Sequence, residues 1–191
     1  MPHDGRSRKL RKRTLVALSR AIEDQTMTSA SRPLIMGSFQ RERHYRGVEH
    51  RYQRMAQVAD LAVVFAKFEH TKPIRPGSPV EVDIEADAAL GHEWAVVVDA
   101  PGFSACLTAW EPPVASPPED DVDRVFEAYW TLDPNVVRAA SRSGAACARE
   151  AGSAVADDID ALLRDRPQAP EASTAALEAL TARMVSYLEL A

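Results

Sequence analysis

Two short apolar runs joined by a Pro-Gly turn constrain the fold of this chain more than any other feature. Residues 94–99 (WAVVVD) and 103–110 (FSACLTAW) are rich in aromatic and β-branched residues, and the tetrapeptide at 99–102 (DAPG) joins them. Pro followed by Gly in so short a gap suits a tight turn, so the two runs predict a β-hairpin. Alternation along the second run places Phe103, Ala105, Leu107 and Ala109 on one face of the sheet.

Three further strands are expected before this hairpin. Residues 33–39 (PLIMGSF) and 61–68 (LAVVFAKF) are short and apolar, and a helix at about 48–60 separates them. This order fits a right-handed parallel βαβ unit, and it also fits an antiparallel pair with the helix lying over the sheet. Residues 80–84 alternate apolar and acidic side chains, which is typical of an edge strand. A helix at about 11–26 precedes the strands, whereas residues 1–9 and 40–47 are expected to be a tail and a polar loop.

The chain after residue 111 is expected to be helical. Four prolines in residues 111–118 predict a stiff connector, and helices are predicted at 121–130, from Pro134 onward, at about 153–165 and at about 171–190. The last helix carries a seam of apolar residues that fits packing on the chain's own body and also a dimer contact: Leu177, Leu180, Met184 and Tyr187. The sequence therefore predicts an α+β fold. A central sheet of about five strands, open to a mixed arrangement, is flanked by helices and followed by a helical C-terminal extension.

Basic residues are concentrated at the N-terminus, although the whole chain carries a net charge of −5. Residues 1–60 carry +7 and residues 61–191 carry −12. The densest cluster is Arg6, Arg8, Lys9, Arg11, Lys12 and Arg13. Such a cluster attracts phosphates or an anionic surface, and a solvated tail is the other interpretation. The pI near 5.6 and the lack of aromatic residues among these charges count against nucleic acid as a partner.

Membrane and secreted classes are disfavoured. No apolar run approaches the roughly 18 residues of a membrane helix, so no membrane span is predicted. The N-terminal charges are not followed by the apolar segment of a secretory signal. Two cysteines, Cys106 and Cys147, are too few for a disulfide framework, so we expect a reducing cytoplasm.

Motifs for catalysis, metal binding and nucleotide binding are missing from the sequence. The residues Gly102-Phe103-Ser104 begin like a nucleophile elbow, but Cys106 stands where that motif needs glycine. The five histidines have no metal-ligand spacing, and neither glycine-rich phosphate motif is present. We therefore predict no catalytic residue and no metal site, and the sequence leaves any cofactor unknown.

Aromatic residues near the ends of the expected elements give the best candidates for a binding site. Together with neighbouring charged residues they are Arg51, Tyr52, Trp94, Trp110, Glu111 and Trp130. These residues predict an amphipathic small-molecule pocket in which Arg51 holds an acidic group of the ligand. The alternative is that they form core and caps, because tryptophan is mostly buried in any case.

Short apolar pieces, each with a polar anchor, follow one another in a characteristic order along the chain. They are LSRAIE at 18–23, SFQ at 38–40, RY and MA within 51–56, EW and VVV within 93–98, Pro101, ACL at 105–107, Glu111 and RVFEAYWT at 124–131. In order and spacing these pieces resemble the DICT domain, a sensory domain of bacterial signalling proteins, over residues 14–138. The family usually has glycine where this sequence has Ala128.

The resemblance implies a non-enzymatic input module. The family occurs with diguanylate cyclase, phosphodiesterase and two-component modules and with helix-turn-helix regulators, and a role in light-related signalling has been suggested for it. It carries no established catalytic residues. The resemblance divides the chain into a basic tail (1–13), a DICT-like sensory domain of about GAF or PAS size (14–138) and a helical C-terminal extension (139–191).

We therefore expect a stand-alone sensor in bacterial signal transduction. It would bind a small ligand or a partner protein, and its terminal helices would pass the signal to a signalling or transcription-regulator protein. A homodimer is expected through the seam of the last helix. Two alternatives from other classes remain. One is a transcription-linked regulator that contacts nucleic acid through the basic N-terminus, and the other is a small enzyme of unrecognised type.

Overall fold

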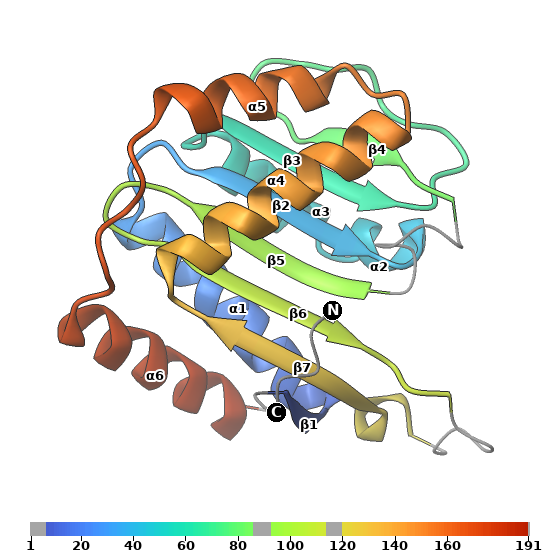
Figure 1. The fold of residues 1–191 in the computed structure, drawn as a ribbon. Helices are drawn as coiled ribbons and strands as arrows, with labels where there is room; N and C mark the ends of the chain where they lie inside the picture. The colour runs from blue at the N-terminus through green and yellow to red at the C-terminus, as the bar shows by residue number, and fades with distance from the viewer. Residues whose placement is uncertain (1–6, 86–92, 114–119, 191) are drawn as a thin grey trace.

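One seven-stranded mixed sheet forms the centre of the protein, with helices on both of its faces (Figure 1). The computed structural model describes residues 7–85, 93–113 and 120–190. The strand order across the sheet is β1-β7-β6-β5-β2-β3-β4. The strands are Arg8–Arg11 (β1), Leu34–Phe39 (β2), Leu61–Ala66 (β3), Val80–Asp83 (β4), Glu93–Asp99 (β5), Ala105–Trp110 (β6) and Val125–Thr131 (β7). The predicted α+β class is confirmed.

The central strands combine a parallel pair with the predicted hairpin. β2 and β3 are parallel, with Leu34 opposite Leu61, and two helices connect them: α2 (Glu42–Arg46) and α3 (Glu49–Ala56). The parallel βαβ arrangement is thus the observed one of the two that the sequence allowed. β4 lies at the edge of the sheet, as predicted. β5 and β6 form the antiparallel hairpin, with Val98 opposite Ala105.

Two helices cover one face of the sheet over β2, β3 and β5. They are α4 (Pro134–Glu150) and α5 (Val155–Asp165). Asp133 caps α4 by accepting a hydrogen bond from the Asn135 amide at 2.8 Å. Pro134 occupies the first turn, and the helix begins there, as predicted. Gly144 lets α4 approach the sheet closely, because a Cβ there would lie 2.6 Å from the sulfur of Met36.

The opposite face is divided between two groups of helices. α1 (Lys12–Ser29), predicted at about 11–26, packs against β5, β6 and β7 through an apolar stripe of Leu15, Leu18 and Ile22. The α2–α3 pair packs against β2 and β3 around Tyr45 and Tyr52. The last helix, α6 (Thr174–Glu189), lies along α1 and not over the sheet (Figure 1).

The prediction of a helix at residues 121–130 is wrong, because most of this segment belongs to strand β7. Only a short 3₁₀ turn, η1 (Asp121–Asp123), precedes the strand. The spacing of Val122, Val125, Phe126 and Tyr129 suggested a helix, but the segment is also rich in β-branched and aromatic residues. Phe126 and Ala128 alternate into the core beside β6, so pairing with an existing strand decided the conformation.

Two more segments differ from the sequence prediction. Residues 8–11, assigned mainly to a tail, form β1, which pairs with β7 at the edge opposite β4. Residues 42–46, predicted as loop, form α2. β1 and β7 account for the difference between the predicted five strands and the observed seven. Most of the predicted Pro-rich connector, residues 114–118, lies outside the described residues.

Candidate functional site

A cavity of about 240 Å³ lies between α1, the α2–α3 pair and the sheet. Residues of both core clusters on this face line it, so it occupies the place where the two clusters meet. One side of α1 forms a long wall, with these lining residues: Lys12, Val16, Ser19, Arg20 and Glu23. Lys12 and Glu23 are eleven positions apart, which is about 16 Å of helix, so the cavity is elongated along α1.

Aromatic rings form the middle of the cavity. Trp94 and Phe126 meet edge to face with their ring centroids 6.2 Å apart, and Phe39 meets Tyr52 in the same way at 5.3 Å. All four rings line the cavity. The indole nitrogen of Trp94 donates to the hydroxyl oxygen of Ser19 at 3.0 Å, which fixes the ring against α1. These fixed rings offer flat apolar surfaces to a ligand.

The hydroxyl of Tyr52 is a buried polar group with no hydrogen-bond partner among the described residues. Tyr52 is 0% exposed, and burial raises the pKa of its phenol well above 10. Its ring fits against β2 because residue 37 is glycine, where a Cβ would lie 2.4 Å from the Tyr52 oxygen. Burying an unpaired hydroxyl costs stability, so this group keeps an unused hydrogen-bonding capacity in a residue that lines the cavity.

Arg51 joins the cavity to two carboxylates of α1. Its Nε donates to Glu23 at 2.5 Å and its Nη2 donates to Asp24 at 2.8 Å. Burial raises the pKa of Glu23, although the charge of Arg51 opposes that rise. The carboxylates in turn raise the pKa of Arg51, against its own burial, so the guanidinium stays charged. Arg51 therefore lines the cavity, where two acids of the same chain already bind it.

The other end of the cavity is basic. Lys12 pairs with Asp121, and Arg124 pairs with Asp121 and with Glu111, where its Nε lies 2.8 Å from the carboxylate. The guanidinium of Arg124 also lies 5.4 Å from the ring centroid of Phe126. His44 completes this end, and both its burial and the nearby cations, including Arg43 and Lys12, lower the pKa of its imidazole.

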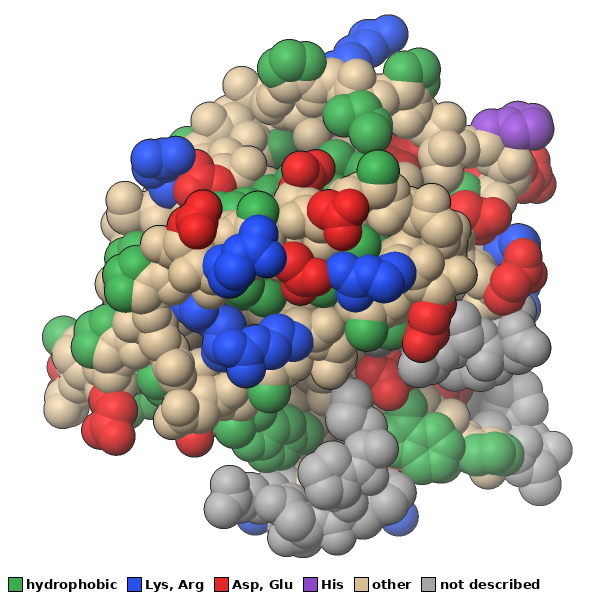
Figure 2. Space-filling model, turned by 45° about the horizontal axis from the view of Figure 1, so that its top comes forward, with side chains coloured by type: hydrophobic (Ala, Val, Ile, Leu, Met, Phe, Trp, Pro, Cys, Tyr) green, Lys and Arg blue, Asp and Glu red, His purple; other side chains and the backbone are tan. Residues whose placement is uncertain are grey.

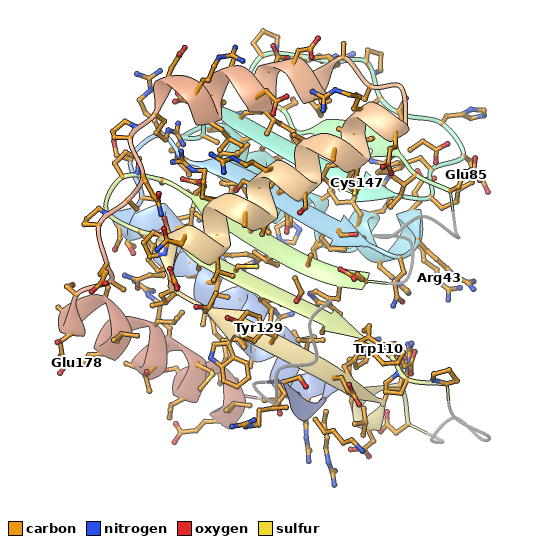
Figure 3. All side chains as sticks on the ribbon, in the orientation of Figure 1. Arg43, Glu85, Trp110, Tyr129, Cys147 and Glu178 are labelled. Atoms are coloured by element: carbon orange, nitrogen blue, oxygen red, sulfur yellow. The ribbon has the colours of Figure 1, made fainter. Side chains whose placement is uncertain are left out.

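The structure brings together half of the residues predicted for the site. Arg51, Tyr52 and Trp94 line one cavity. Glu111 lies behind it as the partner of Arg124. Trp110 and Trp130 do not line it. Trp110 is the last residue of β6, and its side chain lies on the side of the sheet that carries α4. Tyr129, within β7, lies on the same side (Figure 3). Trp130 lies four residues along β7 from Phe126, which is about 13 Å of strand.

Several lining residues were missed at the sequence level. They are Lys12, Ser19, Glu23, Phe39, His44, Arg124 and Phe126. One signal was present in α1, where Ser19 and Glu23 interrupt the apolar stripe and are nevertheless 4% and 6% exposed. Polar side chains on the buried side of a helix need partners, so they indicate a polar site beneath the helix.

Other candidate chemistry has little structural support. Cys106 is buried beneath α4, and its burial raises the pKa of the thiol to about 12. Within the described ranges, no group of three His, Cys, Asp or Glu residues is arranged to hold a metal ion. No helix in the described part of the chain is long and apolar enough to cross a membrane. In the basic cluster, Arg11 and Lys12 pair with Asp123 and Asp121.

Comparison with family models identified one match. Residues 2–112 match the DICT model, described as a sensory domain in diguanylate cyclases and two-component systems. The match starts nearer the N-terminus and ends earlier than the predicted 14–138. It covers β1 to β6 and most of the cavity, whereas Phe126 and Arg124 lie beyond it. Searches of curated proteins and of solved structures found no match.

Proposed function

The chain belongs to the DICT sensory domain family, a family of signalling input domains, and from this we propose that it is a ligand-controlled input module. A small molecule binds in the cavity beneath α1, and the terminal helix α6 passes the change to a signalling or transcription-regulator protein. The module performs no catalysis, and it works in the cytoplasm of a bacterium.

One carboxylate carries this proposal, because it connects the cavity with the C-terminal helix. Asp24 on α1 accepts from Arg51, which lines the cavity, and its other oxygen accepts from the hydroxyl of Tyr187 on α6. A ligand that draws on the charge of Arg51 therefore changes the partner of Tyr187. The residues at the two ends of this connection, Arg51 and Tyr187, lie 136 positions apart in the sequence.

α6 is attached to α1 lightly enough to respond. Leu180 is its one buried residue, and Met184 and Tyr187 pack beside it in the core cluster under α1. Arg183 adds hydrogen bonds to Gln25 at 2.9 Å and to Thr28 at 3.2 Å. Elements with few buried contacts open at low free-energy cost, so losing one polar contact shifts the population of docked α6 measurably.

Hydrogen exchange in the Arg51→Met variant tests this connection. Arg51 belongs to α3, and the Asp24 carboxylate accepts hydrogen bonds from both Arg51 and Tyr187 of α6. We expect the amides of α6 to exchange about fivefold faster than in the wild type, which corresponds to roughly 1 kcal/mol of lost docking. The matched control is Arg54→Met, because Arg54 is exposed on the same helix. If the amides of α6 exchange equally fast in Arg51→Met and in the wild type, the proposed connection from Arg51 through Asp24 to Tyr187 is contradicted.

The ligand itself is tested on freshly purified protein by native mass spectrometry and an absorption spectrum. An additional mass that dissociates on activation, or an unexplained absorption band, would identify a bound molecule. A colourless protein of the sequence mass that no small molecule stabilises would favour input from a partner protein.

The homodimer is a separate part of the proposal. Leu180, Met184 and Tyr187 of the predicted seam pack on α1 of the same chain, so a dimer contact is left to the exposed apolar residues of α6, such as Leu177. Light scattering at micromolar concentration should give twice the monomer mass. A monomer mass that persists at higher concentration would remove the dimer from the proposal.

A further inference from the structure

The wall of the cavity is mostly apolar, and most of its charged lining residues in the described part of the chain are cations. Lys12, Arg20, Arg51 and Arg124 line the cavity directly, whereas Glu23 is the one carboxylate among the lining residues. The acids that balance the cations, Asp24, Asp121 and Glu111, lie on their outer side and do not line the cavity. A molecule inside the cavity therefore meets an apolar wall whose charged groups are mainly ammonium and guanidinium groups.

Donors remain available at the basic end. Arg124 uses three of its five N–H groups for bonds to Glu111 and Asp121, and Lys12 uses one of three for Asp121, among the described residues. Charge-assisted hydrogen bonds to a carboxylate are about twice as strong as neutral ones. The positive surroundings, which also lower the pKa of His44, favour an anion over a neutral group at this end.

Contacts between neighbouring lining residues give the order of the cationic end, the aromatic rings and the Tyr52 hydroxyl along the cavity. Arg124 lies over Phe126, Phe126 meets Trp94, and Trp94 bonds Ser19, one turn before Glu23 on α1. Tyr52 belongs to the Glu23 end, because it follows Arg51 on α3 and Arg51 bonds Glu23. The cavity thus offers an anion site, then flat aromatic walls, then one buried hydroxyl.

We propose that the cavity binds a small aromatic carboxylate that carries a hydroxyl group on the far side of its ring. The carboxylate lies toward Lys12 and Arg124, the ring lies between Trp94 and Phe126 on one side and Phe39 on the other, and the ligand hydroxyl bonds the hydroxyl of Tyr52. The volume of about 240 Å³ is below the roughly 300–1,000 Å³ of drug-sized sites, which restricts the ligand to a small ring system. This inference rests on the proposed function and names the ligand class for the same cavity.

Calorimetric titration of the full chain with three matched probes tests the class. The probes are 4-hydroxybenzoate, its neutral amide 4-hydroxybenzamide, and benzoate, which lacks the hydroxyl. We expect 4-hydroxybenzoate to bind about tenfold more tightly than the amide, because charge-assisted bonds are lost. Benzoate should bind several-fold more weakly than 4-hydroxybenzoate, because the Tyr52 hydroxyl then stays unpaired. An amide that binds as tightly as the acid, or no binding by any probe, would overturn the proposal.

Two variants assign the ends of the ligand. Lys12→Gln should remove most of the preference for the acid over the amide, whereas Lys9→Gln, exposed on β1, should leave it unchanged. Tyr52→Phe should bring the affinities for 4-hydroxybenzoate and benzoate to about the same value. If Lys12→Gln still prefers the acid over the amide, the carboxylate is not bound at Lys12. If Tyr52→Phe still prefers 4-hydroxybenzoate over benzoate, the ligand hydroxyl is not bound at Tyr52. If the three probes fail but native mass spectrometry finds a molecule of other chemistry, the ligand class fails while the proposed function stands.

Discussion

The two faces of the sheet bury their apolar side chains in different ways. Under α4 and α5 a continuous apolar cluster fills the space, and one buried ion pair ties the helices to the sheet. Under α1, α2 and α3 the core is divided into two clusters, with a polar-lined cavity between them. Oppositely charged side chains are interspersed over the outer surface of the α4–α5 side (Figure 2).

The ion pair under α4 satisfies every group that it buries. Arg138 donates to both oxygens of Asp99, at 2.6 and 3.2 Å, and to the carbonyl oxygens of Leu163, Arg166 and Pro167. Beneath α1, by contrast, the hydroxyl of Tyr52 is buried without a partner. Arg138 and Asp99 therefore stabilise the α4–α5 side, although that side also buries one unpaired oxygen, on Glu93. The unpaired hydroxyl of Tyr52 differs in that its residue lines a cavity, so its hydrogen-bonding capacity lies beside space for a ligand.

The largest expected effect is the loss of the buried pair. Arg138→Ala leaves Asp99 charged and unpaired at 2% exposure, so we expect about 3–5 kcal/mol lower stability and a melting temperature roughly 10 °C lower. The matched control is Arg149→Ala, whose side chain is 53% exposed in its pairs with Asp157 and Asp160, and it should cost less than about 1 kcal/mol. Equal losses for the two variants, measured by denaturant unfolding, would contradict a structural role for the buried pair.

A smaller effect of opposite sign is expected under α1. Tyr52→Phe removes a buried hydroxyl that has no partner, so the ligand-free protein should gain about 1 kcal/mol. Thr26→Val is the control, because the Thr26 hydroxyl is buried and donates to the Ile22 carbonyl at 2.8 Å; it should lose about 1 kcal/mol. A loss in both variants would mean that the Tyr52 hydroxyl contributes to folding and is not reserved for binding.

The smallest effect concerns pH and a carboxylate on the α4 side. Glu93 has one buried oxygen without a partner among the described residues, and burial raises its pKa above 4.5. The folded protein therefore holds this proton more tightly than the unfolded chain does. The stability from Glu93 is complete below pH 4.5 and falls as the pH rises through the raised pKa.

Glu93→Gln removes this part of the pH dependence. The stability difference between variant and wild type should shift in favour of the variant as the pH rises from about 4 to 7, measured by urea unfolding at each pH. A difference that is constant over this range would show that Glu93 has the same pKa in both states.

The sequence predicted correctly those elements whose conformation is decided by their own residues. The Pro-Gly turn specified the β5–β6 hairpin, and Asp133 with Pro134 specified the start of α4. β7 was misjudged because Val125 to Thr131 suits a strand by composition and a helix by spacing. β1 was missed because four residues with three cations carry no period and form a strand only by pairing with β7.

The sequence by itself determined the class of the fold, the hairpin and the start of α4, because neighbouring side chains decide turns, caps and periodicity. Three of its six proposed binding residues line the cavity, and their role stays a prediction. Only the tertiary structure decided the cavity. Glu23 and Arg51 are 28 residues apart, and Asp24 and Tyr187 are 163 apart. Contacts at such separations form only when packing has set the helices side by side, and no local pattern encodes which polar groups will then face one another.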